Sequence, residues 1–152
     1  MHRLLLTLAI TTTVGSLLSS NPAAAQVLPA AKRAERVEIT TAPALELATD
    51  HLTIIRWTTN NPGGSDVHYG IVHYGTDPRD LTQTAKSPIR LNRGQPYTVF
   101  RVRMEGLKPR TTYYYRVTSE ESNGKSDGMK STVNKFTTPG PGERIVAYPK
   151  HN

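Results

Sequence analysis

The side chains that could support metal or acid–base chemistry are few and scattered in this 152-residue chain. It contains no cysteine, and the histidines beyond the first two residues are His51, His68, His73 and His151. No two of them have the spacing of a recurring metal-binding motif. A five-residue offset on a regular strand also sends His68 and His73 to opposite faces. We therefore expect surface histidines, no metal and no cofactor.

Nucleophilic and paired-carboxylate chemistry also lack a sequence signal. The chain has no Gly-x-Ser-x-Gly elbow, and its twelve acidic residues are dispersed, with Glu120–Glu121 as the only acidic residues that are adjacent. This pair lies in a segment that we interpret as a polar loop, where solvated charge is the ordinary explanation. The sequence therefore predicts a protein that is not an enzyme.

The apolar residues alternate with polar ones at the period of β-strands over most of the chain. Thr53, Ile55 and Trp57 should share one face of a strand. From Phe100 onward, apolar and polar residues alternate in the same way. Turn-forming clusters, of which Asn60–Ser65 is the strongest, separate these segments at short intervals. Such spacing predicts an all-β sandwich of about seven strands. The expected strands fall within residues 37–47, 52–59, 66–74, 97–104, 112–119 and 130–138.

The segment Leu107-Lys-Pro-Arg-Thr-Thr-Tyr113, with Trp57 before it and Phe136-Thr-Thr-Pro139 after it, resembles a fibronectin type III domain. The resemblance spans about residues 37–139 and implies a seven-stranded immunoglobulin-like sandwich. It also implies that the Tyr113 hydroxyl bonds back to the backbone near Leu107. The core residues that it implies are Trp57, Leu107, Tyr115 and Val117.

A narrower similarity lies in Trp57-Thr-Thr59, Val72-His-Tyr-Gly-Thr76 and the stretch from Gly106 to Val117. These segments are similar to the fibronectin-like domain that precedes the catalytic domain of purple acid phosphatases. That family's catalysis resides in downstream metal-binding motifs, and neither Gly-Asn-His-Asp nor Gly-His-x-His is present here. The similarity therefore implies a stand-alone accessory domain without phosphatase activity.

The two ends of the chain are expected to lie outside the sandwich. Residues 1–25 have a basic start, an apolar run and Ala23-Ala24-Ala25, which predicts a signal peptide cleaved after Ala25. The apolar run is too short for a membrane span, so we expect a secreted or periplasmic protein. Residues 26–36 are expected to be a flexible N-terminal segment, and residues 140–152 a C-terminal tail.

Two outward faces are candidate binding surfaces. On one sheet, Tyr69, Ile71 and His73 are expected beside Tyr114 and Arg116, where an aromatic cluster could anchor a protein or stack on sugar rings. Tyrosine also suits exposed strands by propensity alone.

The other candidate face is basic. Arg56, Arg101 and Arg103 should point away from the core on neighbouring strands of the second sheet. Three guanidinium groups could grip an anionic polymer, or they could serve only to keep sheets from stacking. The formal net charge of +7 is compatible with either reading.

The sequence thus favours an exported, non-enzymatic binding or adhesion module that makes protein–protein contacts through the Tyr69/Tyr114 face. A module that binds polysaccharide or the cell envelope is one alternative, and a stand-alone accessory domain of a metallophosphatase is another. Nucleic acid is not an expected partner, and the sequence leaves the oligomeric state open.

Overall fold

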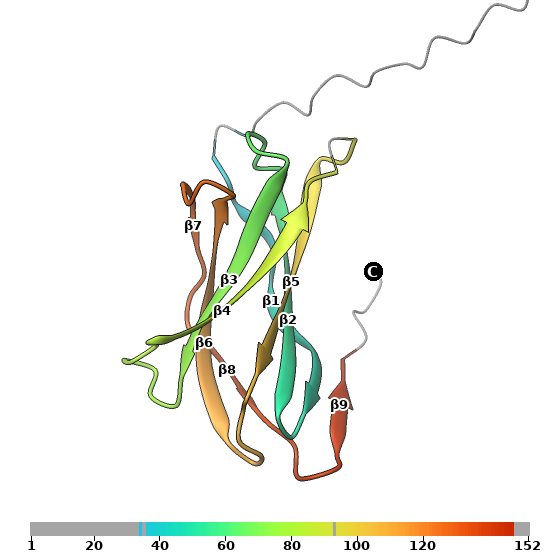
Figure 1. Ribbon diagram of the computed structural model, residues 1–152, viewed down its shortest axis with the longest axis vertical. Coiled ribbons are helices and arrows are strands. Elements are labelled where there is room, and N and C mark those ends of the chain that lie inside the picture. The colour runs from blue at the N-terminus through green and yellow to red at the C-terminus, as the bar shows by residue number, and fades with distance from the viewer. Residues whose placement is uncertain (1–33, 35, 93, 148–152) are drawn as a thin grey trace, which may run out of the picture.

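Two antiparallel β-sheets pack face to face in the computed structural model, which describes residues 34, 36–92 and 94–147 (Figure 1). Sheet A has the order β5-β2-β1-β9, with bounds Tyr97–Glu105, Leu52–Asn60, Ile39–Thr49 and Arg144–Val146. Sheet B has the order β4-β3-β6-β7, with bounds Gln83–Arg90, Val67–Gly75, Thr112–Glu121 and Ser126–Lys130. Strand β8 (Asn134–Thr137) also pairs with β6. The prediction of an all-β, immunoglobulin-like sandwich is confirmed.

Strands β7 and β8 occupy a single position beside β6, interrupted at residues 131–133. Ser131 maintains the pairing across this break, because its hydroxyl accepts the Val117 N–H at 2.9 Å and its own N–H donates to the Val117 carbonyl at 3.0 Å. Strands β1 to β8 therefore occupy seven positions in the two sheets. One of these strands, β4, lies in a segment for which the sequence predicted no strand.

Strand β9 is an addition that the sequence did not lead us to expect, because it lies in the segment interpreted as a tail. The turn from Gly140 to Glu143 has the 3.0 Å Glu143 N–H to Gly140 carbonyl bond, and Gly142 adopts φ 76°. With proline and glycine at its two central positions, this is a type II turn. It returns the chain to the open edge of β1, where Arg144–Val146 pairs with Leu47–Thr49. Sheet A therefore extends past the expected boundary at residue 139.

The core is built around Trp57, which is fully buried and stacks on Phe100 with ring centroids 5.1 Å apart. A Cβ on Gly70 of the opposite sheet would come within 2.9 Å of both rings and of Val102. Only a glycine lets the two sheets approach this closely. The other residues assigned to the core, Leu107, Tyr115 and Val117, are buried as expected.

Tyr113 fixes the corner between β5 and β6. The Lys108 N–H donates to the Tyr113 hydroxyl at 3.0 Å, which confirms the role that the fibronectin resemblance implies. Its ring also contacts Phe136 and Tyr74, with centroids 5.7 and 6.1 Å away. On the same strand, burial raises the pKa of Tyr115 to about 12.

The expected signal peptide, its cleavage site after Ala25 and nearly all of the expected flexible segment 26–36 lie outside the described residues. Arg36, at the end of that segment, is held by a bond from the Asn60 side-chain amide to its carbonyl at 2.8 Å. Within the described ranges, no helix is long and apolar enough to cross a membrane.

Candidate binding surface

All five residues of the predicted aromatic surface lie on the outer face of sheet B. In β3 and β6, buried side chains alternate with partly exposed ones. The partly exposed set includes Tyr69, Ile71, His73, Tyr114 and Arg116. The period-two interpretation of these strands therefore places each side chain on the expected face.

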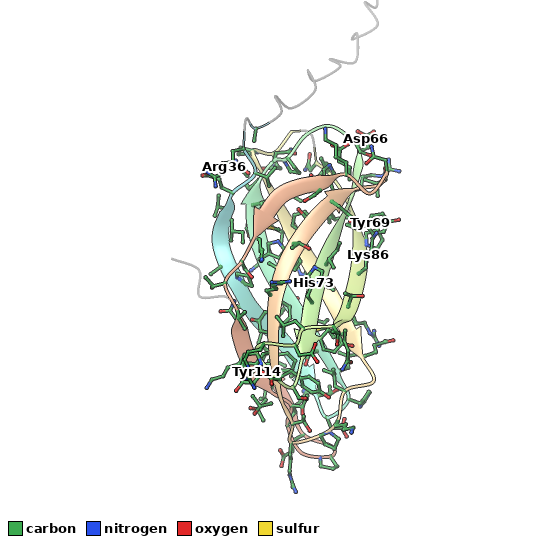
Figure 2. All side chains as sticks on the ribbon, turned by 90° about the vertical axis from the view of Figure 1, so that its left-hand side faces the viewer. Arg36, Asp66, Tyr69, His73, Lys86 and Tyr114 are labelled. Atoms are coloured by element: carbon green, nitrogen blue, oxygen red, sulfur yellow. The ribbon has the colours of Figure 1, made fainter. Side chains whose placement is uncertain are left out.

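The strand register separates the two tyrosines that we expected to lie side by side. Tyr69 is opposite Glu120, whereas Tyr114 is opposite Gly75 at the other end of the β3–β6 pair. Six residues of strand, about 20 Å at 3.3 Å per residue, lie between these positions. Figure 2 shows Tyr69 near the top of the face, His73 in the middle and Tyr114 near the bottom. The expectation of one Tyr69/Tyr114 cluster is wrong.

At the Tyr69 end of the face, the aromatic ring is in contact with another side chain of the same protein. The Lys86 ammonium lies over the Tyr69 ring, 4.2 Å from its centroid, and Lys86 also forms an ion pair with Glu120. Glu120 and Glu121 belong to β6, so their assignment to a loop is wrong. Because a cation covers Tyr69, this ring is not a bare platform for stacking.

The middle of the face is electropositive. His73 and Arg116 are opposite each other on β3 and β6, and the His73 Nε2 lies 3.0 Å from the Thr118 hydroxyl. Burial lowers the pKa of His73, and the nearby charges of Arg116 and Lys130 lower it further. Burial and the neighbouring positive charges therefore both disfavour the protonated form of His73.

Three cations lie in this part of the outer face of sheet B. Arg116 is at the centre, Lys130 is opposite Thr118 on the β7 side, and Lys135 is opposite Tyr114 on β8. Among the described residues, no carboxylate forms an ion pair with any of the three. The Arg116 Nε is also buried without an acceptor. We call Arg116, Lys130 and Lys135 the cation cluster.

The predicted basic face on sheet A has a different character. Arg56, Arg101 and Arg103 do point outward from β2 and β5, and Arg56 is directly opposite Arg101. Glu46 accepts a bond from the Arg101 Nε at 2.8 Å and lies 3.7 Å from the Arg56 Nε. Glu105 lies 2.6 Å from the Arg103 Nε. The positive charge of this face is therefore largely compensated.

An open groove of about 450 Å³ adjoins the cation cluster at the edge of sheet B. It is lined by Arg36–Ile39 from the segment leading into β1 and by Gly128–Lys130 from β7. Lys130 borders both the groove and the outer face, and the groove also contains Arg36 and Glu38, which carry opposite charges.

One buried polar network was missed from the sequence. His68 is fully buried, so its interpretation as a surface histidine is wrong. Its Nδ1 lies 2.9 Å from the Asp127 Oδ2 and its Nε2 lies 2.9 Å from the Gly63 carbonyl. The Ser119 hydroxyl donates to the same Asp127 oxygen at 2.6 Å.

The His68 network ties the loop at residues 61–66 to β6 and β7. The two ring nitrogens of His68 face two oxygen atoms, one on the Asp127 carboxylate and one on the Gly63 carbonyl. The side chains of His68 and Asp127 are 0% and 1% exposed, so substrate has no access to the Ser119 hydroxyl beside them. The network is therefore structural. One feature of the sequence could have indicated that His68 is buried. It lies four residues before Val72 on the same strand, so both side chains point to the inner face.

The loop at residues 61–66 contacts the turn that follows β6 at one end of the sandwich. The Ser65 and Ser122 hydroxyls are 2.8 Å apart, and the Ser122 N–H donates to the Val67 carbonyl at 3.0 Å. In the part of the chain that the structure describes, no group of three or more His, Asp or Glu side chains is arranged to hold a metal ion.

Comparisons with solved structures find matches at low sequence identity. The sensor domain of the anti-sigma factor RsgI4 from Pseudobacteroides cellulosolvens is 19% identical with a TM-score of 0.48, covering 74% of this chain and 99% of that one. A fibronectin type III domain of human contactin 1 is 17% identical with a TM-score of 0.44, covering 91% and 99%. The FN5 domain of Drosophila Lar is 16% identical with a TM-score of 0.39, covering 66% and 94%.

No curated protein sequence matches the chain. A family model does match, that of the purple acid phosphatase N-terminal domain, and it spans residues 41–138, which covers β1 through β8. The matched region includes the Trp57 core, the Tyr113 corner and both outer faces, so the family's fold and this architecture agree. The chain therefore belongs to the purple acid phosphatase N-terminal domain family, a family of fibronectin-like sandwiches.

Proposed function

We propose that this chain is an exported, non-enzymatic module that mediates protein–protein contacts through the outer face of sheet B. The observation that carries the proposal is the contrast between the two faces. The arginines of sheet A are paired with carboxylates, whereas the cation cluster of sheet B has no partner within the described chain. Unpaired charge beside exposed aromatic and aliphatic side chains is typical of a recognition surface.

Polysaccharide binding is the weaker alternative. Sugar-binding faces use bare aromatic rings as stacking platforms, and Lys86 covers the Tyr69 ring. Tyr114 lies about 20 Å further along the strands, too far to form a second platform for the same sugar unit.

Family membership supports a second candidate, in which the module serves a metallophosphatase that another chain supplies. This role is compatible with protein contacts through sheet B, because the phosphatase would then be the partner. Adding the purified module to such an enzyme should change its activity or stability. Phosphatase turnover by the purified module alone, with divalent metal added, would contradict the non-enzymatic assignment.

The direct test is capture of partners by immobilised protein (residues 26–152) from an envelope extract of the producing cells. The variant Tyr69→Ala/Tyr114→Ala removes the aromatic groups from sheet B. Tyr97→Ala is the control, because Tyr97 is a 47% exposed tyrosine on sheet A. We expect wild type and Tyr97→Ala to retain the same polypeptide and the double variant to lose it. Equal capture by all three, or capture of glycan alone, would refute the proposal.

A further inference from the structure

The cation cluster indicates what kind of partner the outer face of sheet B would recognise. Arg116 is the central residue, with its Nε buried and without an acceptor. Its guanidinium is adjacent to a break in the sheet, because the position across from it falls between β7 and β8, where Val133 is 44% exposed. Lys130 and Lys135 flank this break on either side. The arrangement offers one partly buried planar donor and two exposed ammonium groups.

We infer that this cluster is a docking site for an acidic segment of a partner polypeptide, whose carboxylates would pair with Arg116, Lys130 and Lys135. The inference rests on the proposed function and gives the partner its chemistry. Charge complementarity is the first argument, since the cluster holds three cations and no carboxylate pairs with them among the described residues. A guanidinium fork fits a carboxylate in two-point geometry.

Spacing and composition favour a polypeptide over an acidic glycan. Outward positions along β6 repeat every two residues, about 6.6 Å, which is also the repeat of same-side residues in an extended chain. Carboxylates at every second residue of such a chain could therefore lie opposite successive cations of the cluster. The surrounding Ile71, Tyr114 and Val133 would contact apolar side chains of the same segment, which an acidic glycan does not supply.

The probe is a short fluorescent poly-L-glutamate, with polygalacturonate as the acidic glycan for comparison. Lys130→Gln/Lys135→Gln removes two charges from the cluster, and Arg101→Gln/Arg103→Gln removes two from sheet A. The latter pair is a matched control, because both side chains are more than half exposed and already paired with carboxylates. Arg116→Gln tests the central guanidinium, and thermal unfolding of each variant checks that it is folded.

We expect the Lys130/Lys135 variant to bind poly-L-glutamate about tenfold more weakly than wild type, and the control to change by about twofold or less. Arg116→Gln should weaken binding at least as much as the lysine pair. Binding should also weaken with salt. As an independent readout, bound poly-L-glutamate should raise the pKa of His73 in an NMR titration, because carboxylates would offset the charges of Arg116 and Lys130.

Equal losses in both double variants would mean attraction to net charge alone and would overturn the inference. Binding of polygalacturonate but not poly-L-glutamate would overturn it in favour of an acidic glycan, and no binding to either would overturn it outright. The proposed function fails separately, when capture from extract is independent of Tyr69 and Tyr114. Capture that needs those tyrosines but withstands loss of the cluster would refute only the acidic partner.

Discussion

Replacing His68 by leucine is the perturbation that most directly tests how the loop end of the sandwich is held. His68 connects Gly63, before β3, to Asp127 on β7, and both of its ring nitrogens are bonded at 2.9 Å. Leucine preserves the apolar volume but leaves the Gly63 carbonyl and the Asp127 carboxylate without this partner. Among the described residues, the Ser119 hydroxyl at 2.6 Å is then the remaining side-chain donor to Asp127.

The size of the effect follows from burial. The Asp127 side chain is 1% exposed, so its charge cannot be solvated when His68 is removed. Breaking a buried ion pair by deleting one partner costs about 3–5 kcal/mol. A domain of this size has a free energy of unfolding of about 5–15 kcal/mol, so the variant should be destabilised strongly and could be largely unfolded.

A double-mutant cycle in urea separates pairing from packing. Asp127→Leu should also be costly, but the combined variant His68→Leu/Asp127→Leu should cost less than the sum of the two, since no unpaired charge then remains. We expect a coupling free energy of about 2 kcal/mol. Ser65→Ala/Ser122→Ala is the control at the same end, and it should cost less than about 0.5 kcal/mol because this hydroxyl pair is exposed. Additive effects of His68 and Asp127, or a cost below about 1 kcal/mol for His68→Leu, would refute the reasoning.

Three further measurements test the core, the corner and the face. Gly70→Ala should cost about 1–3 kcal/mol in urea unfolding, because its Cβ would meet the Trp57 ring at 2.9 Å, and an unchanged midpoint would contradict the close approach of the sheets. Tyr113→Phe should lower the free energy of unfolding by about 0.5–1.5 kcal/mol, because it removes the acceptor of the Lys108 N–H. An unchanged free energy of unfolding would show that this hydrogen bond does not stabilise the corner. Because the folded-state pKa of His73 lies below its unfolded value of 6.5, the unfolded chain binds the proton more readily, so stability should fall as the pH drops below 6.5. His73→Asn should flatten the acid side of this stability profile, and an identical profile in both proteins would show that His73 does not contribute.

The alternation of residue types was sufficient to predict the fold and the facing of every candidate residue. Period two separates inner from outer side chains without any knowledge of pairing, so Trp57 and Tyr115 were assigned to the core correctly. The sheet to which each strand belongs came from the fibronectin resemblance, which places Arg101 and His73 on opposite outer faces of the sandwich, as observed. The Tyr113 corner followed from a local motif whose hydrogen bond spans only five residues.

The errors concern relationships between strands, which a single sequence does not contain. The separation of Tyr69 from Tyr114 depends on the register of β3 against β6, and a shift along the strands leaves both facing outward. His68 was wrongly expected at the surface, because the partner that allows its burial, Asp127, lies 59 residues away and no local pattern indicates it. Strand β9 was missed because three residues after a turn give too short a pattern, although the edge of β1 can pair with them.

The two outer faces also show why a count of basic residues does not identify a binding surface. Each face presents outward cations on neighbouring strands, and the sequence drew attention to the arginines of sheet A because they alternate so regularly. Glu46 neutralises that face from β1, a strand whose bulged register could not be deduced. On sheet B the outward Glu120 of β6 pairs with Lys86, and among the described residues no carboxylate pairs with Arg116 or its flanking lysines. The difference between compensated and uncompensated charge exists only in the folded chain. A partner's carboxylates would therefore find the more favourable electrostatic interaction on sheet B.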